Sequence, residues 1–306
     1  MQKTINSTEF RKMIMFGARL LENNRSKVDA LNVFPVPDGD TGTNMSLTMQ
    51  SAVKELSACQ SNSFMEICDC VSKGALKGAR GNSGVILSQI LRGICSVLRE
   101  CGKEFDTRTF SKAMEAGTKV AYGAVSVPKE GTILTVVRMM SEHSGKAASR
   151  KKNFEDFFAD VIAEGDKALA MTPELLPVLK KAGVVDAGGQ GYVVILNAML
   201  LCLQGKFVAK APVTETKTSA EFSAINDEEI TFTYCTEFIV AREKQRDPEL
   251  LRTFLQNLGD CLVLVEDDDI IKVHVHTDAP GRALTEALRY GPLQTVKIEN
   301  MRNQHT

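Results

Sequence analysis

Apolar residues recur at helical spacing over the first two hundred positions of the chain. Stripes with steps of three and four residues predict helices over 10–21, 45–56, 64–71, 85–98, 110–120, 133–140 and 154–162. A further run, 192–203, is apolar almost all round, which predicts a central helix. No alternating run occurs before residue 205, so we expect the N-terminal part to be all-helical. Ser7, Thr109 and Asn153 are expected to cap three of these helices.

The pattern changes after residue 205. Residues 206–225 are rich in Thr, Ser, Ala and Lys without periodicity, and we interpret them as a linker. Behind them, strands are predicted at 230–240, 261–265, 270–276 and 295–298, with helices beginning at Asp247-Pro248 and at Pro280. The order strand, helix, strand, strand, helix, strand is that of the split βαβ, ferredoxin-like plan. We therefore predict an α plus α/β two-domain chain, with a helical domain over 1–205 and a small α+β domain over 226–306.

Composition narrows the possible functions. The net charge of the 306 residues is −1, which argues against non-specific nucleic-acid or membrane-surface binding. No apolar run reaches the roughly 18 residues that a membrane span needs. The first ten residues hold no apolar signal core, so we expect a cytoplasmic protein.

The densest chemical signal is the segment LNVFPVPDGDTGTNM, residues 31–45. Asp38 and Asp40 stand two apart in a turn that Gly39 and Gly42 leave unhindered, and a helix is predicted directly after them. Carboxylate oxygens beside a helix N-terminus suit a Mg²⁺–phosphate site. Taken alone, this triplet is more often an ordinary Asp-Gly turn before a helix cap.

Three more polar, glycine-containing loops precede predicted helices: KGARGNSG at 77–84, EGT at 130–132 and DAGGQG at 186–191. Loops of this kind can wrap backbone N–H groups around phosphate oxygens. If the four loops gather at one end of the helices, they form one nucleotide site. The alternative is four separate helix connections in which glycine serves as a C-cap.

These motifs closely resemble the ATP-binding domain that bacterial fatty acid kinase shares with the dihydroxyacetone-kinase L subunit. The motif LNVFPVPDGDTGTNM resembles that of the fatty acid kinase A-subunit branch in particular. The segments VHVHTDAPG and VKIENMRNQH resemble the middle domain of that branch. The resemblance implies an eight-helix barrel over 1–205 that binds ATP with two Mg²⁺ ions.

The resemblance also implies roles for particular residues. Asp38 and Asp40 match catalytic metal ligands, and Asn32 falls at the position of a third ligand that is an aspartate in glycerone kinases. The residues that match nucleotide-contacting positions are Thr41, Thr43, Asn44, Met45, Ser83, Gly84, Gly131, Thr132, Gly188 and Gly189.

The reaction implied is transfer of the γ-phosphoryl group of ATP to a fatty acid carboxylate, which gives an acyl phosphate. The acid would be presented by a separate fatty-acid-binding partner protein. Family members of full length are longer and carry a C-terminal domain, so turnover by this chain alone is left open.

A second candidate site combines Cys235, His274 and His276. The two histidines are two apart on a predicted strand, so both imidazoles project to one side. The split βαβ order places Cys235 on the neighbouring strand, and one thiolate with two imidazoles suits Zn²⁺. The alternative is a pair of half-exposed histidines near a core thiol.

Two other functions remain open at this point. One is a regulatory protein that senses nucleotide without turnover, and the other is a glycerone-type kinase. The exposed edges of the predicted sheet also allow two chains to pair, so a homodimer is a further expectation.

Overall fold

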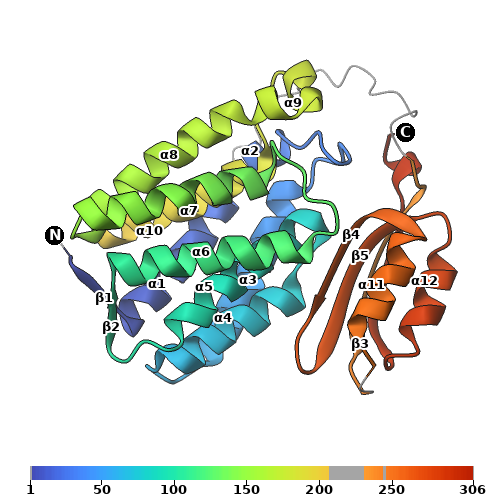
Figure 1. The fold of residues 1–306 in the computed structure, drawn as a ribbon, viewed down its shortest axis with the longest axis horizontal. Coiled ribbons are helices and arrows are strands. Elements are labelled where there is room, and N and C mark those ends of the chain that lie inside the picture. The colour runs from blue at the N-terminus through green and yellow to red at the C-terminus, as the bar shows by residue number, and fades with distance from the viewer. Residues whose placement is uncertain (1, 207–230, 244–245, 306) are drawn as a thin grey trace. The chain divides into compact units, whose positions relative to one another are not determined.

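The computed structural model describes residues 2–206, 231–243 and 246–305, which form two compact units (Figure 1). Residues 2–122 and 129–206 make the helical unit, while 123–128 and the part from 231 onward make the second unit. Nearly all of the expected linker, 206–225, lies outside the described residues, so the predicted domain limits stay predictions.

The helical unit contains ten helices among its described residues. They are α1 (Ser7–Asn23), α2 (Arg25–Asp29), α3 (Thr41–Ala58), α4 (Phe64–Gly78), α5 (Gly81–Leu98), α6 (Thr107–Ala124), α7 (Ile133–Arg150), α8 (Phe154–Leu175), α9 (Pro177–Ala182) and α10 (Ala187–Leu203). Eight of them are 15 to 22 residues long, and α2 and α9 are short. The prediction of a helical N-terminal domain is therefore confirmed.

Helix α10 packs against five other helices, α1, α2, α3, α7 and α8. Its sequence explains this central place, because apolar residues cover nearly its whole circumference. Tyr192, Val193, Ile195, Leu196 and Met199 are all buried. The prediction from the apolar run at 192–203 is confirmed.

The expectation of an all-helical unit misses one short element. Strands β1 (Thr4–Asn6) and β2 (Glu104–Asp106) pair in antiparallel register. Three residues are too few to show alternation in a sequence. Phe105 of β2 packs among Phe10, Phe64, Phe110 and Phe154, so this strand is held by an aromatic cluster.

Of the three predicted helix caps, the one at Asn153 is confirmed: its side chain accepts from the backbone N–H of Asp156. The other two are wrong. Asn6 rather than Ser7 caps α1, in a reciprocal box with Glu9. Helix α6 begins at Thr107, two residues before Thr109, whose N–H and hydroxyl donate to Asp106.

The second unit follows the predicted strand and helix order. It consists of β3 (Tyr234–Ala241), α11 (Pro248–Gln256), β4 (Gly259–Glu266), β5 (Ile270–Thr277), α12 (Pro280–Ala287), β6 (Leu293–Asn300) and a short 3₁₀ segment, Met301–His305. The sheet order is β4-β5-β3-β6 with every pair antiparallel. This is the ferredoxin-like arrangement.

Both helices lie on one face of this sheet (Figure 1). Phe238, Val273 and Val275 of the sheet are buried with Leu251 and Leu255 of α11. Because side chains alternate along a strand, the residues between them face the opposite side. That opposite face carries Cys235, His274 and His276.

The two edges of the sheet differ. At β4, Val125 forms an isolated bridge with Val263, and the Ser126 N–H donates to the Leu262 carbonyl at 3.2 Å. At β6 no further strand pairs among the described residues, and Val296 and Ile298 are 46% and 43% exposed. Pairing of two chains through β6 stays a prediction.

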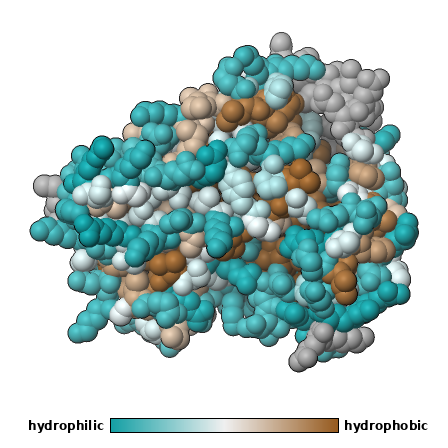
Figure 2. Space-filling model, in the orientation of Figure 1, coloured by the Kyte–Doolittle hydropathy of each residue, from teal (hydrophilic) through white to brown (hydrophobic). Residues whose placement is uncertain are grey.

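The face of the molecule drawn in Figure 2 is mostly hydrophilic, and its apolar residues form small patches. None of the helices in the described part of the chain is long and apolar enough to cross a membrane.

Candidate functional site

The loop between α2 and α3 carries both predicted carboxylates, and Asn32 holds it closed. The buried Asn32 amide nitrogen donates to the Val36 carbonyl at 2.7 Å and to Asp38 Oδ1 at 2.9 Å. Its amide oxygen accepts from the Thr41 hydroxyl. Gly39 has a φ of +64°, a conformation that glycine adopts without strain. The loop therefore fixes Asp38 through Asn32, while Thr41 begins helix α3.

Asp38 and Asp40 form a close pair of acids. Burial, then the charge of Asp40 and a hydrogen bond with it, raises the pKa of Asp38 to about 8. A proton is therefore retained at neutral pH where two carboxylates meet. Carboxylate oxygens are hard ligands, and two carboxylates that repel each other bind a divalent cation such as Mg²⁺ well. The cation would take the place of that proton.

A third carboxylate, Asp29, was not identified from the sequence. It lies at the end of α2, where its two oxygens accept from the Thr43 N–H and the Thr43 hydroxyl, both at 2.9 Å. Burial raises the pKa of Asp29, and the nearby Asp40 adds to the rise. Asp40, the N-cap residue of α3, makes no side-chain cap bond, so Asp29 caps this helix from outside. No sequence signal points to it, because its partners are 11 to 14 positions away.

The second loop packs directly on the first turn of α3. Gly81 has a φ of +55°, and a Cβ there would lie 2.5 Å from the Asn44 side-chain nitrogen. A Cβ on Gly84 would lie 2.5 Å from the Thr48 hydroxyl oxygen. Only glycine therefore permits α5 to begin this close to α3. Ser83 lies in the first turn of α5, beside these contacts.

The fourth loop reaches α3 from another side, since a Cβ on Gly191 would lie 2.7 Å from Met45 Sδ. It is also bound to the third loop. The Asp186 carboxylate caps α10 by accepting from the Gly189 N–H at 2.7 Å, and it accepts further from the N–H groups of Gly188 and Ile133. Ile133 is the first residue of α7, so one side chain joins the N-termini of α7 and α10. Burial raises the pKa of Asp186 to about 6.

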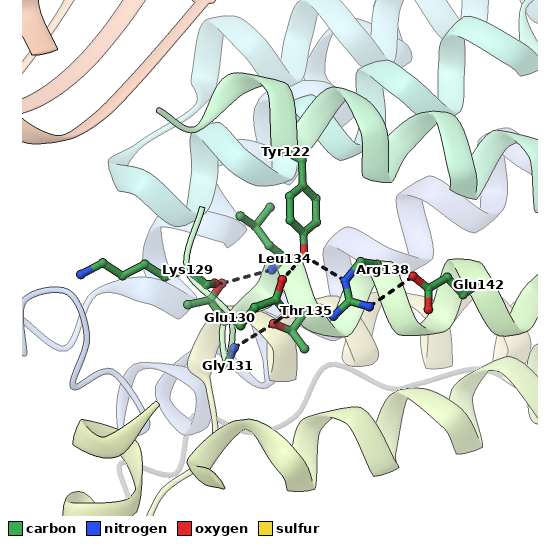
Figure 3. Close-up of polar contacts among 9 residues, drawn as sticks. Tyr122, Lys129, Glu130, Gly131, Leu134, Thr135, Arg138 and Glu142 are labelled. Carbon is green, nitrogen blue, oxygen red and sulfur yellow. Dashed lines mark hydrogen bonds and ion pairs between the residues drawn. The ribbon is translucent and has the colours of Figure 1, made fainter. Parts of the chain in front are cut away.

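A polar network fixes the third loop (Figure 3). Thr135 receives a bond from the Gly131 N–H at 2.8 Å and donates to Glu130 at 2.6 Å. Arg138 binds Glu130 at 2.9 Å and the Tyr122 hydroxyl at 3.2 Å. Burial alone would raise the pKa of Glu130, but the bonds from Thr135, Arg138 and Tyr122 hold it below its ordinary value.

The third loop also returns to the first, because the Lys129 ammonium lies 5.3 Å from the centre of the Phe34 ring. The contacts thus link all four predicted loops to one another within the helical unit. The predicted residues that stand on these linked loops are Asn32, Asp38, Asp40, Thr41, Thr43, Asn44, Met45, Ser83, Gly84, Gly131, Thr132, Gly188 and Gly189. Contacts among the loops therefore connect the N-termini of four helices, α3, α5, α7 and α10, and the acid pair Asp38 and Asp40 directly precedes the first of them.

The second unit brings Cys235, His274 and His276 together on the face of its sheet that α11 and α12 do not cover, where both histidines are buried. One possible ligand atom from each lies within 4.8 Å of the other two. The Nε2 atoms of the two rings are 3.2 Å apart, and Cys235 Sγ is 3.9 Å from His274 Nδ1. Asp260 and Cys261 on β4 also lie near His276. A sulfur and two nitrogens in this geometry fit Zn²⁺.

The pKa values of the two imidazole rings are shifted in opposite directions. Burial favours a neutral His274, but Cys235 and Glu237 raise its pKa overall. Burial, and then the charge on His274, lowers the pKa of His276. Without metal, the pair therefore holds one proton between two close nitrogens.

Comparison with known proteins identifies two matching families. Residues 35–201 match the family described as DAK2 domain, and residues 231–306 match the family of middle domains like that of the fatty acid kinase A-subunit. Protein YloV of Bacillus subtilis is 42% identical over 315 residues, which cover 99% of this chain and 57% of YloV. An uncharacterized protein of Staphylococcus epidermidis is 42% identical over 310 residues, 98% of this chain and 56% of that protein. The chain thus spans little more than half the length of these relatives.

Among solved structures, the dihydroxyacetone kinase of C. freundii aligns with a TM-score of 0.46 and 17% identity, over 65% of this chain and 35% of that one.

Proposed function

This chain belongs to the DAK2 domain family, a kinase-related family, and on that premise we propose that it is the ATP-binding subunit of a fatty acid kinase. The observation that supports the proposal is the set of contacts that links four glycine-containing loops, each before a helix N-terminus, one of which carries Asp38 and Asp40. Free N–H groups at helix N-termini bind phosphate oxygens, and paired carboxylates bind the cation that accompanies them. A nucleoside triphosphate with Mg²⁺ is the ligand that needs both.

Different loops would bind different parts of the nucleotide. Thr43 and Asn44 on α3, with Ser83 and Gly84 on α5, would hold the phosphates. Gly131 and Thr132, with Gly188 and Gly189, would hold the nucleoside end, which Asp186 keeps in place by joining their two helices. Asp38 and Asp40 would hold Mg²⁺, two ions by the family resemblance, and supply no nucleophile.

When bound, Mg²⁺ neutralises charge on the phosphates and on the group in transfer. The chain's own contribution is to position the phosphates against the acceptor and to exclude other geometries. The acceptor would be a fatty acid carboxylate held by a separate fatty-acid-binding protein. A carboxylate oxygen forms a bond to the γ-phosphorus, the bond from that phosphorus to the β–γ bridging oxygen breaks, and ADP leaves with the electron pair. The product is an acyl phosphate.

The middle-domain match supports this acceptor, since that family is named for a fatty acid kinase. We propose in addition that Cys235, His274 and His276 bind Zn²⁺ in that domain. One sulfur and two nitrogens leave a fourth position for water or another ligand.

The test uses the chain with Mg²⁺, ATP and a fatty-acid-binding protein loaded with a long-chain acid, and measures acyl phosphate by trapping with hydroxylamine. Asp38→Asn and Asp40→Asn are expected to lose at least a hundredfold in rate and to lose Mg²⁺-dependent binding of ADP in calorimetry. Asp69→Asn is the control, because this half-exposed acid on α4 forms an ion pair with Arg99 and lies outside the linked loops.

ADP binding without acyl phosphate would favour a nucleotide sensor, and phosphorylation of dihydroxyacetone would favour a glycerone-type kinase. Absence of Mg²⁺-dependent nucleotide binding would contradict the proposal as a whole.

Asn32 can be tested separately. If its amide holds the loop closed, Asn32→Asp loses the bonds to Val36 and Asp38 and adds a third negative charge beside two acids. We then expect Mg²⁺-dependent ADP affinity to fall at least tenfold in calorimetry. A gain in affinity would instead assign Asn32 to the metal ligands, because a carboxylate is the stronger ligand for Mg²⁺.

A further inference from the structure

We propose that Glu237 and Asp260 are positioning residues for the middle-domain metal site, Glu237 by a hydrogen bond with His274 Nδ1 and Asp260 by its charge beside His276 Nδ1, so that both Nε2 atoms face the same ion. The inference rests on the proposed Zn²⁺ site and extends it to two carboxylates that the sequence analysis did not single out.

The register of the sheet places these groups. In the β3–β5 pair, Cys235 is opposite His276 and Glu237 is opposite His274. Residues directly opposite each other, and residues two apart on one strand, share a face. All four side chains therefore stand on the face of the sheet that α11 and α12 do not cover. Glu237, His274 and His276 are each less than 10% exposed.

Glu237 determines the tautomer of His274. Its Oε1 lies 2.9 Å from His274 Nδ1, a hydrogen-bond distance between two buried side chains. An ionised carboxylate only accepts hydrogen bonds, so Nδ1 carries the hydrogen. In a neutral ring the lone pair is then on Nε2, the atom that faces His276.

Asp260 lies beside the Nδ1 atom of His276, but at a longer distance. It is opposite His276 in the β4–β5 register, directly before an irregularity that extends to Val263. Cys261, within this irregularity, has a φ of +50°, so the backbone turns sharply after Asp260. Asp260 Oδ1 lies 3.6 Å from His276 Nδ1, longer than a hydrogen bond, and the carboxylate is nearly half exposed. Its hold on the ring is therefore weaker than that of Glu237.

The two carboxylates determine how the Nε2 atoms of His274 and His276 face each other. With both Nδ1 atoms turned to carboxylates, the two Nε2 atoms face one another across 3.2 Å, a distance at which a shared proton or a shared cation can lie between them. Two nitrogens bound to one tetrahedral Zn²⁺ at 2.0–2.1 Å are about 3.3 Å apart. The observed separation matches that of two nitrogens on a shared Zn²⁺, and Cys235 is within reach as a third ligand.

The experiment measures Zn²⁺ affinity of the whole chain by competition with a chromophoric chelator, on protein purified without a histidine tag. Outer carboxylates of this kind typically contribute 10- to 100-fold in metal affinity. We expect Glu237→Gln to weaken Zn²⁺ binding at least tenfold and Asp260→Asn about threefold. Cys235→Ser, which removes a ligand, is expected to weaken it more than either.

Glu299→Gln is the matched control. Glu299 is opposite Cys235 on β6 and on the same face, but its ion pair is with Lys297 at 2.7 Å and not with an imidazole. Glu299→Gln removes one negative charge near the site, as Glu237→Gln does, but it leaves the partners of both imidazoles in place. The Zn²⁺ affinity of this variant should therefore stay within twofold of that of the unmodified chain. Thermal unfolding of the metal-free variants, and the visible spectrum of the Co²⁺-loaded ones, separate a lost fold from a lost orientation.

The outcomes are distinct. If the unmodified chain binds no Zn²⁺, the proposed metal site fails. If it binds Zn²⁺ and Glu237→Gln binds equally well, or no worse than Glu299→Gln, the positioning role is wrong while the metal site stands.

Discussion

At the scale of single residues, Asp186 joins the N-termini of two helices in the candidate site, α7 and α10. It is buried, has no cationic partner among the groups that set its pKa, and receives N–H groups from α10 and from the start of α7. The partial positive charge of two helix N-termini stabilises a carboxylate in such a place, whereas burial disfavours its charged form.

This balance predicts a pH dependence of stability. Folding raises the pKa of Asp186 from 3.8 to about 6, so between pH 4 and pH 6 the folded chain keeps a proton that the unfolded chain has lost. The unfolding free energy therefore falls as the pH rises through this window and levels off above it. The expected contribution is about 2 kcal/mol between pH 4 and pH 7.

Urea unfolding of the unmodified chain and of Asp186→Asn at pH 4, 5, 6 and 7 measures the contribution of Asp186 to the unfolding free energy. Asparagine keeps an acceptor oxygen but does not titrate, so the stability difference between the two proteins should shift against the unmodified chain as the pH rises. A difference that stays constant across the window would contradict the assignment.

Residues with local signals were predictable, and residues with partners only in space were not. Asp38 and Asp40 stand in a turn whose glycines and following helix can be read directly from the sequence. Asp29, Glu237 and Asp260 act on Thr43, His274 and His276, each on another element. Nothing in their own neighbourhood along the chain marks them, so only the folded chain identifies them.

At the scale of elements, glycines set how closely the helices approach. Gly93 of α5 lies against Ala116 and Gly117 of α6: a Cβ on Gly93 would lie 2.5 Å from the Gly117 Cα. A Cβ on Gly117 would in turn lie 2.9 Å from the Ile90 carbonyl oxygen. Two facing glycines thus permit backbone-to-backbone contact between α5 and α6.

Gly93→Ala should therefore force the helices apart and lower the unfolding free energy by roughly 2–3 kcal/mol, as overpacking does. Gly145→Ala in α7 is the control, because its Cβ would meet only the Ser111 hydroxyl, at 3.9 Å. There the better helix propensity of alanine should raise stability by about 0.5–1 kcal/mol. Denaturant unfolding of both variants checks the opposite signs, and equal effects would refute the close crossing.

Helix existence was predictable from periodicity, but exact starts were not. Ser7 and Thr109 are of residue types that commonly cap helices. The N-cap positions are nevertheless occupied by Asn6 and Asp106, because each of these side chains accepts from the backbone N–H three residues ahead. The pair β1–β2 had no signal at all, since its strands are three residues long.

At the scale of the whole molecule, the chain enters the second unit twice. Residues 123–128 leave the helical unit after Tyr122, contact β4 through Val125 and Ser126, and return at Lys129. Tyr122 and Glu130, on either side of this excursion, are hydrogen-bonded to each other at 3.0 Å. A single bridge leaves no periodic pattern, so the sequence could not predict it.

Ser126→Pro tests the excursion, since proline cannot donate to the Leu262 carbonyl. Loss of this bond should weaken the local structure by about 1 kcal/mol and speed hydrogen exchange and proteolysis around 123–128 severalfold. Val127→Ala, at a side chain 71% exposed, should leave both unchanged. Exchange measured by mass spectrometry on the intact chain decides, and identical profiles would argue that the segment is not held at β4.

The excursion at 123–128 has a consequence for how such proteins can be recombined. Exchanging everything behind the helical unit for the matching part of a relative would bring in a foreign β4 without the hexapeptide that pairs with it. A working chimera should therefore need three junctions, one on each side of the hexapeptide and one behind residue 206, and libraries made with a single crossover should yield fewer folded clones than libraries made with all three.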